Sequence, residues 1–312
     1  MKIFNNTKIP KNFKGSALAI GNFDGVHVGH KKVFQQTKKI AKKKKIKFGV
    51  LTFTPLPVMF FNKKIKNYRL TSENQKLKLF KKSKVDFIIN IKFNKKFSKI
   101  SAENFIKKII YEKISPQSLS VSNNFKYGRK RRGNVNLLKK FSYKYNYRLL
   151  NIEAFKYNGK IVSSTRIRKC LRSGKINLAN KLLSRTWFVE GIVNRGKKLG
   201  RKLGYRTCNI HLKNYILPKL GIYVVKVMIG NKRKIYGGAA YLGLRPTFNG
   251  KEIFLETYIF GIKKNLYQKS LRVYFIKLIR GDKKFKNRDT LIKQMNKDVI
   301  IAKKGLKINL VL

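Results

Sequence analysis

The stretch that most constrains this chain is Gly21–His30, which reads GNFDGVHVGH. An apolar run, Ser16–Ile20, precedes it and fits a buried strand, and apolar residues at near-helical spacing follow it. A glycine-rich turn between a strand and a helix start suits phosphate, because free backbone N–H groups and the helix dipole attract anions there. His27 and His30 are three residues apart, so both imidazoles can face the first helical turn and donate hydrogen bonds to a phosphate chain.

Each part of this pattern also has an ordinary structural explanation. A single glycine-rich turn is a weak signal, and a lone histidine usually serves packing. The chain has only three histidines, however, and two of them share this turn. The sequence therefore favours phosphate handling here, with Gly21, Gly25 and Gly29 letting backbone N–H groups approach an anion closely.

Composition indicates the class of protein without naming a partner. A chain of 312 residues that is 43% hydrophobic is expected to form one or two globular domains. The formal charge of +64 first suggests nucleic-acid binding. The lysines are spread along nearly every segment, however, and Asn, Ile, Phe and Tyr are plentiful, as a bias toward A/T-rich codons would produce. We therefore expect no specific nucleic-acid partner.

No segment of the sequence predicts secretion or membrane insertion. The longest apolar runs are interrupted and far shorter than a membrane span, and the N-terminus lacks an apolar signal region. Two cysteines, Cys170 and Cys208, do not make a disulfide framework. We expect a cytoplasmic protein with small-molecule substrates and no membrane partner, either a monomer or a weak homo-oligomer.

Two patterns of secondary structure meet near residue 185. Strand and helix signals alternate over residues 1–184, which predicts a parallel sheet with helices on both faces. Strands and glycine turns dominate from Phe188 onward, and a helix over about 288–304 follows. We therefore predict an α/β domain over residues 1–184 and a small antiparallel barrel with a C-terminal helix over residues 185–312.

A polar loop follows one of the predicted parallel strands. The segment 121–133, VSNNFKYGRKRRG, places Asn124 and Phe125 beside basic groups. An amide and an aromatic ring in that setting could hold a flat ring and a phosphate. A solvated basic loop explains the segment equally well, so both interpretations stay open.

Hydroxyls gather at the start of another predicted helix. Ser163, Ser164 and Thr165 are adjacent there, and Arg168 follows within one turn. A helix cap needs only one such hydroxyl. Hydroxyls, free N–H groups and a guanidinium together would make a clamp for pyrophosphate.

The predicted barrel carries a second polar set. Thr207 and Asn209 alternate onto one side of an extended segment and offer two neutral oxygens, which together with phosphate oxygens suit Mg²⁺. Glu256 lies in the apolar segment FLETYIF, where its alternate neighbours Phe254 and Tyr258 place it on an aromatic face. A carboxylate there is either solvent-facing or a catalytic base, and with only 12 acids in the chain we favour the base.

Three motifs together resemble one family. GNFDGVHVGH resembles the HxGH nucleotidyltransferases, and with SSTRIR (163–168) and GRKLGYRTCN (200–209) it is similar to the bacterial bifunctional riboflavin kinase/FMN adenylyltransferases, or FAD synthetases. The resemblance covers almost the whole chain. It implies a Rossmann-like domain that joins FMN to AMP from ATP, giving FAD, and a barrel that phosphorylates riboflavin to FMN with ATP and Mg²⁺.

The resemblance also implies residue roles. The residues that would act catalytically are His27, His30, Arg168 and Glu256. Those that would contact ATP are Gly21, Phe23, Gly25, Gly29, Ser163, Ser164, Thr165, Gly200 and Gly204. Those that would bind flavin are Asn124, Phe125 and Arg280, and the metal would lie against Thr207 and Asn209.

The sequence departs from the family pattern at a few positions. Residues that differ from those usual in the family are Leu56, Ser122, Arg206, Cys208, Tyr241 and Gln268. Tyr241 stands where asparagine is common, and Arg206 stands where a proline would fix φ in the kinase loop. Two other functions remain as alternatives: another HxGH nucleotidyltransferase with the barrel as a binding module, and a basic nucleic-acid-binding protein.

Overall fold

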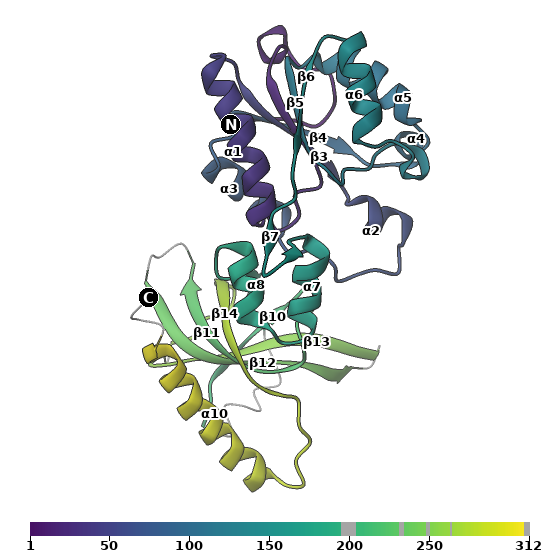
Figure 1. Cartoon of the computed structure of the whole chain (residues 1–312). Coiled ribbons are helices and arrows are strands. Elements are labelled where there is room, and N and C mark those ends of the chain that lie inside the picture. Colours follow the sequence, from purple (N-terminus) through teal and green to yellow (C-terminus); the bar gives the residue numbers. More distant parts are fainter. Residues whose placement is uncertain (195–203, 231–233, 248–249, 263, 309–312) are drawn as a thin grey trace. The chain divides into compact units, whose positions relative to one another are not determined.

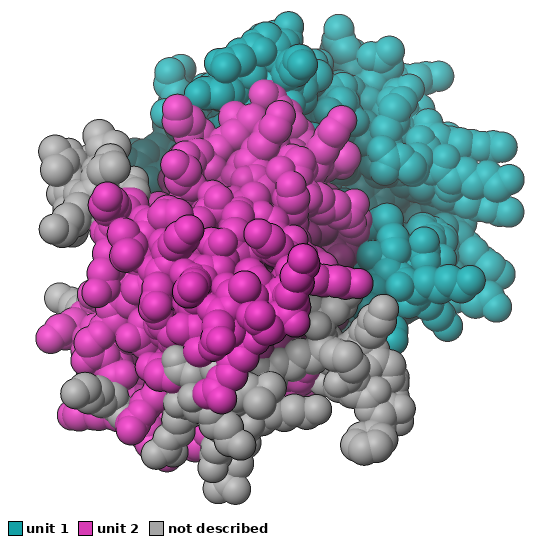
Figure 2. All heavy atoms as spheres, turned by 90° about the horizontal axis from the view of Figure 1, so that it is seen from below, with its two compact units in different colours: residues 1–66, 71–164 teal, residues 67–70, 165–312 magenta. Residues whose placement is uncertain are grey.

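The structure is a computed structural model that describes residues 1–194, 204–230, 234–247, 250–262 and 264–308. It contains two compact units, which Figure 2 shows in different colours. Residues 1–66 and 71–164 form the first unit, and residues 67–70 and 165–312 form the second.

The first unit is built on a parallel sheet of six strands in the order β1-β4-β3-β2-β5-β6 (Figure 1). The strands are β1 (Lys2–Phe4), β2 (Ala17–Ile20), β3 (Phe48–Thr54), β4 (Phe87–Lys92), β5 (Ser118–Ser122) and β6 (Arg148–Ile152). From β2 the chain runs outward through β3 and β4, and then returns to place β5 on the other side of β2. The predicted parallel sheet is confirmed, and the turns after β2 and β5 flank the point where strand order reverses, where such sheets bind ligands.

Helices cover both faces of this sheet. The helical segments of the unit are η1 (Lys11–Phe13), α1 (Val28–Lys43), α2 (Pro57–Phe61), α3 (Glu73–Lys82), α4 (Lys95–Ser98), α5 (Ala102–Asn104), the π-helical η2 (Phe105–Ile114), η3 (Arg129–Arg131) and α6 (Val135–Lys144). A short hairpin of β7 (Lys156–Tyr157) and β8 (Lys160–Ile161) follows β6. Helix α3 begins with a capping box, in which Ser72 and Gln75 each accept the other's backbone N–H, at 3.2 and 3.0 Å.

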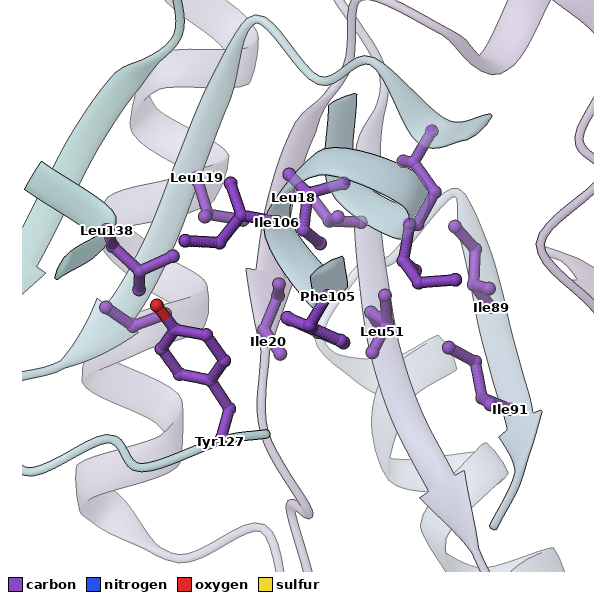
Figure 3. Close-up of a cluster of buried hydrophobic side chains, with 14 of the residues drawn as sticks. Leu18, Ile20, Leu51, Ile89, Ile91, Phe105, Ile106, Leu119, Tyr127 and Leu138 are labelled. Carbon is purple, nitrogen blue, oxygen red and sulfur yellow. The ribbon is translucent and has the colours of Figure 1, made fainter. Parts of the chain in front are cut away.

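Alternation along the buried strands creates two apolar cores. In β2, Leu18 and Ile20 join one cluster, whereas Ala17 and Ala19 join another on the opposite face. Figure 3 shows the first cluster, where Phe105 and Ile106 of η2 and Leu138 of α6 meet strand residues such as Leu51, Ile89 and Leu119. The second cluster holds Val33 and Phe34 of α1 and Phe80 of α3. Both cores therefore fix the position of the turn that leaves β2.

The second unit is an antiparallel sheet of six strands in the order β10-β13-β12-β11-β14-β9. Its strands are β9 (Phe188–Ile192), β10 (Thr207–His211), β11 (Gly221–Ile229), β12 (Ile235–Thr247), β13 (Gly250–Ile259) and β14 (Ser270–Gly281). A bridge between Asn194 and Asn209 links the β9 end to the β10 edge, so the sheet closes on itself. The predicted barrel is confirmed. Its interior is filled by buried residues that include Ile210, Tyr223, Val225, Leu242, Leu255, Leu271, Val273 and Phe275.

Three helices and the short segment 67–70 complete the second unit as the structure describes it. The helices are α7 (Ser164–Arg172), α8 (Ile176–Leu183) and α10 (Arg288–Ile308), and α10 confirms the predicted C-terminal helix. Helix α10 packs on the outer face of the barrel, where Ala302 meets Val224 and Ala239. The segment 67–70 bonds into this unit, because the N–H groups of Tyr68 and Arg69 donate to the carbonyl oxygen of Asn214.

The contacts group α7, α8 and residues 67–70 with the barrel. The predicted division at residues 184 and 185 stays a prediction about functional domains. None of the helices in the described ranges is long and apolar enough to cross a membrane.

The packing of η2 predicts a stability effect in the first unit. Replacing the fully buried Ile106 by alanine (Ile106→Ala) should lower the free energy of unfolding of that unit by about 2–5 kcal/mol, because it removes apolar contacts and leaves a cavity. Urea denaturation followed by far-UV circular dichroism measures the change. Ile161→Ala is the matched control, since Ile161 is 45% exposed and should change stability by less than about 0.5 kcal/mol. Equal effects of the two substitutions would contradict the packing described.

Candidate functional site

The two predicted histidines lie at the N-terminus of α1, in the turn after β2. His27 is the N-cap residue, and its Nδ1 accepts the backbone N–H of His30 at 3.4 Å. The two imidazole rings stack with centroids 3.6 Å apart and planes inclined by 22°. His27 is buried and His30 is half-buried. Because Nδ1 of His27 accepts a hydrogen bond, the proton of the neutral ring is on Nε2, which is then a donor.

A buried carboxylate holds the backbone of this turn. Asp24 is 4% exposed, and its Oδ1 accepts both the N–H and the hydroxyl of Thr71, at 3.3 and 3.4 Å. Its carbonyl oxygen accepts the hydroxyl of Ser164 at 2.9 Å. Phe23 and Val26, on either side, have φ values of 49° and 39°, which are unfavourable for residues with side chains. The hydrogen bonds to Asp24 therefore maintain a strained turn.

Two glycines of the motif make room for aromatic rings. A Cβ at Gly29 would lie 3.2 Å from two ring atoms of His27, and a Cβ at Gly21 would lie 3.0 Å from the ring of Phe23. The Phe23 ring in turn meets His30 edge-on, with centroids 5.1 Å apart. Gly25, with φ of 83°, is the glycine of this turn that needs its conformational freedom.

The loop after β5 lies at the same edge of the sheet, because β5 pairs with β2. Asn124 is exposed, and its Oδ1 accepts the hydroxyl of Ser122 at 2.8 Å. Phe125 is half-buried and stacks on Tyr127 with centroids 5.5 Å apart. The amide and the ring predicted to hold flavin are thus beside the histidine turn in strand order.

The predicted pyrophosphate clamp divides between the two units. Ser163 and Ser164 belong to the first unit, whereas Thr165 and Arg168 belong to the second. Arg168 is only 6% exposed; its Nε donates to the carbonyl oxygen of Tyr68 at 2.8 Å, and its guanidinium carbon lies 3.7 Å from the centre of the Tyr68 ring. The joint action of these four residues stays a prediction.

A basic hollow of about 410 Å³ surrounds Arg168 in the second unit. We call it the α7 hollow. Its lining residues are Tyr68, Thr165, Arg168, Lys169, Arg172 and Ser173. Three cations and one hydroxyl on α7, with Ser173 just after it and an aromatic ring beside it, make this hollow suited to a phosphate chain.

The strand register brings the predicted kinase residues together. Asn209 of β10 lies directly opposite Glu256 of β13, and Thr207 lies opposite Tyr258. Directly opposed residues project on the same side of a sheet with Cβ atoms about 4.5–5.5 Å apart. Asn209 is 6% exposed, and Thr207 and Glu256 are half-buried. Gly204 is exposed with φ of 85°. Gly200 lies outside the described residues.

Tyr241 lies on the other side of Glu256. It is opposite Glu256 in the β12–β13 register, and its hydroxyl donates to Oδ1 of Asp282 at 3.2 Å. Burial raises the pKa of Tyr241 to about 12, and the charges of Asp282 and Glu256 act in the same direction, against that of Arg280. The phenol is therefore neutral at ordinary pH and keeps the proton that it donates to Asp282.

Arg280, predicted to bind flavin, is engaged with the C-terminal helix. Its Nε and Nη2 donate to the carboxylate of Asp298 at 3.1 and 2.8 Å, and its Nη1 donates to the carbonyl oxygen of Gly281. Asp298 is 4% exposed. This bidentate pair ties β14 to α10, and the flavin contact stays a prediction.

Comparison with known proteins identifies the family of the chain. Residues 9–166 match the FAD synthetase family, and residues 183–306 match the riboflavin kinase family. A bifunctional riboflavin kinase/FMN adenylyltransferase from Buchnera aphidicola is 41% identical, over 97% of this chain and 96% of its own length. The enzyme of the same description from Escherichia coli is 31% identical, over 96% and 95%. The chain belongs to the bifunctional riboflavin kinase/FMN adenylyltransferase family.

The fold of the whole chain also matches a solved structure. A crystal structure described as a macrolide-efflux protein from Streptococcus pneumoniae matches with a TM-score of 0.84 and 25% identity, over 96% of this chain and 98% of that one. Both halves of a riboflavin kinase/FMN adenylyltransferase are therefore present here in the expected order. The resemblance first based on three motifs is confirmed.

Sequence reasoning missed the residues that support the two sites. Asp24 stands within the GNFDGVHVGH motif. Because the chain has only 12 acidic residues, a carboxylate in that motif was a signal that could have identified Asp24. Tyr68 and Asp282 carried no such signal, because their partners Arg168 and Tyr241 are distant in sequence. Neither Tyr68 nor Asp282 lies within the three motifs by which the chain resembles a riboflavin kinase/FMN adenylyltransferase.

The register of β10 predicts the reactivity of Cys208, which faces away from Thr207 and Asn209. Burial raises the pKa of its thiol to about 11, so little thiolate forms near neutral pH. In a Cys170→Ala variant, which leaves one cysteine, the alkylation rate should rise about tenfold per pH unit up to about pH 10. Iodoacetamide labelling followed by mass spectrometry measures the rate. In urea the rate should level off near pH 9, about the ordinary thiol pKa. The same plateau in the folded chain would contradict the half-buried placement of Cys208.

Proposed function

We propose that the two reactions of this family occur at the two polar sites described above. FMN is adenylylated at the turn that holds His27 and His30, and riboflavin is phosphorylated on the barrel face that holds Thr207, Asn209 and Glu256. The observation that carries the assignment is the direct pairing of Asn209 with Glu256, which sets an oxygen ligand and a carboxylate side by side. Incubation of purified protein with riboflavin, ATP and Mg²⁺, with separation of FMN and FAD, tests it.

In the kinase reaction, Glu256 accepts the proton of the terminal ribityl hydroxyl. The hydroxyl oxygen forms a bond to the γ-phosphorus of ATP, the bond from that phosphorus to the bridging oxygen breaks, and ADP leaves. The half-buried position of Glu256 in an apolar strand supports this role. Little covalent chemistry is required of the protein, since positioning and charge neutralisation dominate phosphoryl transfer.

The donor set on this face fits Mg²⁺. Thr207 and Asn209 offer neutral oxygens, and Mg²⁺ in kinases is held by one or two protein groups, substrate phosphates and water. Within the described ranges, no group of three or more His, Cys, Asp or Glu side chains could form a dedicated metal cage. The metal would neutralise phosphate charge. Thr207 and Asn209 orient the phosphates toward the acceptor, and Gly204 leaves room for ATP beside them. Gly200 stays a predicted ATP contact outside the described residues.

In the adenylyltransferase reaction, a phosphate oxygen of FMN attacks the α-phosphorus of ATP and pyrophosphate leaves. The nucleophile is already anionic, so no general base is needed. His27 and His30 stabilise the charge that develops on the transferring group, and the amides of the turn Gly21–Gly29 hold the ATP phosphates. The stacked position of the two imidazoles at a helix N-terminus supports this role.

The pyrophosphate and flavin ends of that reaction need further groups. Ser163, Ser164, Thr165 and Arg168 hold the leaving pyrophosphate, and the cations of the α7 hollow favour its binding. Asn124 and Phe125 hold the flavin end. The substrates are small molecules; we expect no specific nucleic-acid partner, a monomer or weak homo-oligomer, and a cytoplasmic location.

Separate sites predict reciprocal losses of activity. His30→Ala should lower FAD formation about 10²–10³-fold, because it removes a group that stabilises the transition state, and should leave FMN formation intact. Glu256→Gln should lower riboflavin phosphorylation about 10²–10⁴-fold and spare adenylylation of supplied FMN. Chromatography of both products with each variant measures this. Each variant is the control for the other, and equal loss of both activities in either would count against two sites.

The α7 hollow predicts a salt-dependent contribution from an exposed cation. Arg172→Ala should raise the KM for ATP in FAD formation about tenfold at low ionic strength, because it removes a charge-assisted hydrogen bond. The difference should shrink as salt screens the charge. Lys175→Ala, which removes a nearby exposed cation that does not line the hollow, is the control. A similar change in KM for both variants would show a general charge effect instead.

A further inference from the structure

Tyr241 occupies the position next to the proposed base of the kinase. Glu256 lies between Asn209 on β10 and Tyr241 on β12, so the three side chains form one row on one face of the barrel sheet. An aromatic ring therefore lies directly beside the proposed base.

The ring of Tyr241 lies along its own strand, over Gly243. A Cβ built at Gly243 would be 2.1 Å from both Cζ and the hydroxyl oxygen of Tyr241, so any side chain at Gly243 would displace the ring. The hydroxyl donates to Asp282, just beyond the end of β14. The ring is thus fixed over Gly243 and by Asp282, and it remains half-buried, with part of its surface open to a ligand.

The other aromatic rings around Glu256 are already paired. Phe254 packs against His211 with centroids 4.3 Å apart, and Tyr258 meets Tyr205 edge-on at 5.1 Å. Within the described part of the chain, no aromatic ring packs against Tyr241. Tyr241 therefore offers a fixed flat surface one strand away from the carboxylate, a separation of about 5 Å.

We infer that Tyr241 determines acceptor specificity in the kinase reaction by stacking on the flat ring of riboflavin while Glu256 meets the ribityl hydroxyl. The inference rests on the proposed kinase site. Riboflavin carries its aromatic ring system and its terminal hydroxyl at opposite ends of the ribityl chain, which matches a platform and a base on neighbouring strands. Stacking of a flat heterocycle on an aromatic side chain strengthens binding roughly 5- to 150-fold, judged by alanine substitution.

Flavin fluorescence gives a direct test on the full chain. A tyrosine in contact with an excited flavin donates an electron and quenches its emission, whereas a phenylalanine does not. Titration of riboflavin should therefore give strong quenching with the native chain and weak quenching with Tyr241→Phe, at a Kd within about threefold because the stacking surface is kept. Tyr241→Ala should raise Kd, and the KM for riboflavin, about tenfold or more with little change in kcat.

Tyr236→Phe is the matched control. Tyr236 is also half-buried on β12, but it is opposite Val227 and therefore on the other face of the sheet, so its quenching should equal that of the native chain. Undiminished quenching in Tyr241→Phe, or its loss in Tyr258→Phe instead, would overturn the inference while FMN formation by the native chain still supports the kinase. If the native chain neither binds riboflavin nor forms FMN, the proposed function and the inference both fail. Tyr241→Phe retains the ring, so a folding defect in Tyr241→Ala does not remove the test.

Discussion

The register between β10 and β13 is the constraint on which the proposed chemistry of the barrel depends. It sets Asn209 opposite Glu256, and a slip by one residue would turn one of the two strands so that these side chains no longer share a face. The register is fixed from the other side of the sheet, where Ile210 and Leu255 are opposite each other and fully buried. Exposing such a side chain costs about 1.5–3 kcal/mol, so the apolar interior determines which polar groups meet outside.

In the first unit, hydrogen bonds to a buried carboxylate, and not a strand register, hold the polar side chains in position. The turn after β2 contains two non-glycine residues with positive φ, Phe23 and Val26, each costing about 1–3 kcal/mol. Burial of the Phe23 ring and the charge-assisted hydrogen bonds to Asp24 offset this cost, at about 1.5–3 kcal/mol each. The strained turn is thereby held against α1, where His27 and His30 stack.

Local sequence patterns predicted the helices and strands well. They did not predict which residues distant in the sequence pair with each other. The alternation of strands and helices and the C-terminal helix could both be predicted from spacing, because each depends on residues near one another in the chain. The pairing of Asn209 with Glu256 depends on how the barrel closes, which spacing does not encode. For the same reason the sequence did not indicate that residues 67–70 bond into the second unit, or that Arg280 pairs with Asp298.

The high positive charge of the chain explains why acidic residues say more about the location of a functional site than basic residues do. With 76 lysines and arginines against 12 acids, a cation near a phosphate site is expected from composition alone. The acids whose contacts are known tie elements together, as Asp24, Asp86, Glu190 and Asp298 do. In a chain that binds polyanionic ATP, each added carboxylate near the phosphates opposes binding. Glu256 lies on the outer face of the barrel between an amide and a phenol, and our proposal that it accepts a proton gives a negative charge at that position a chemical role.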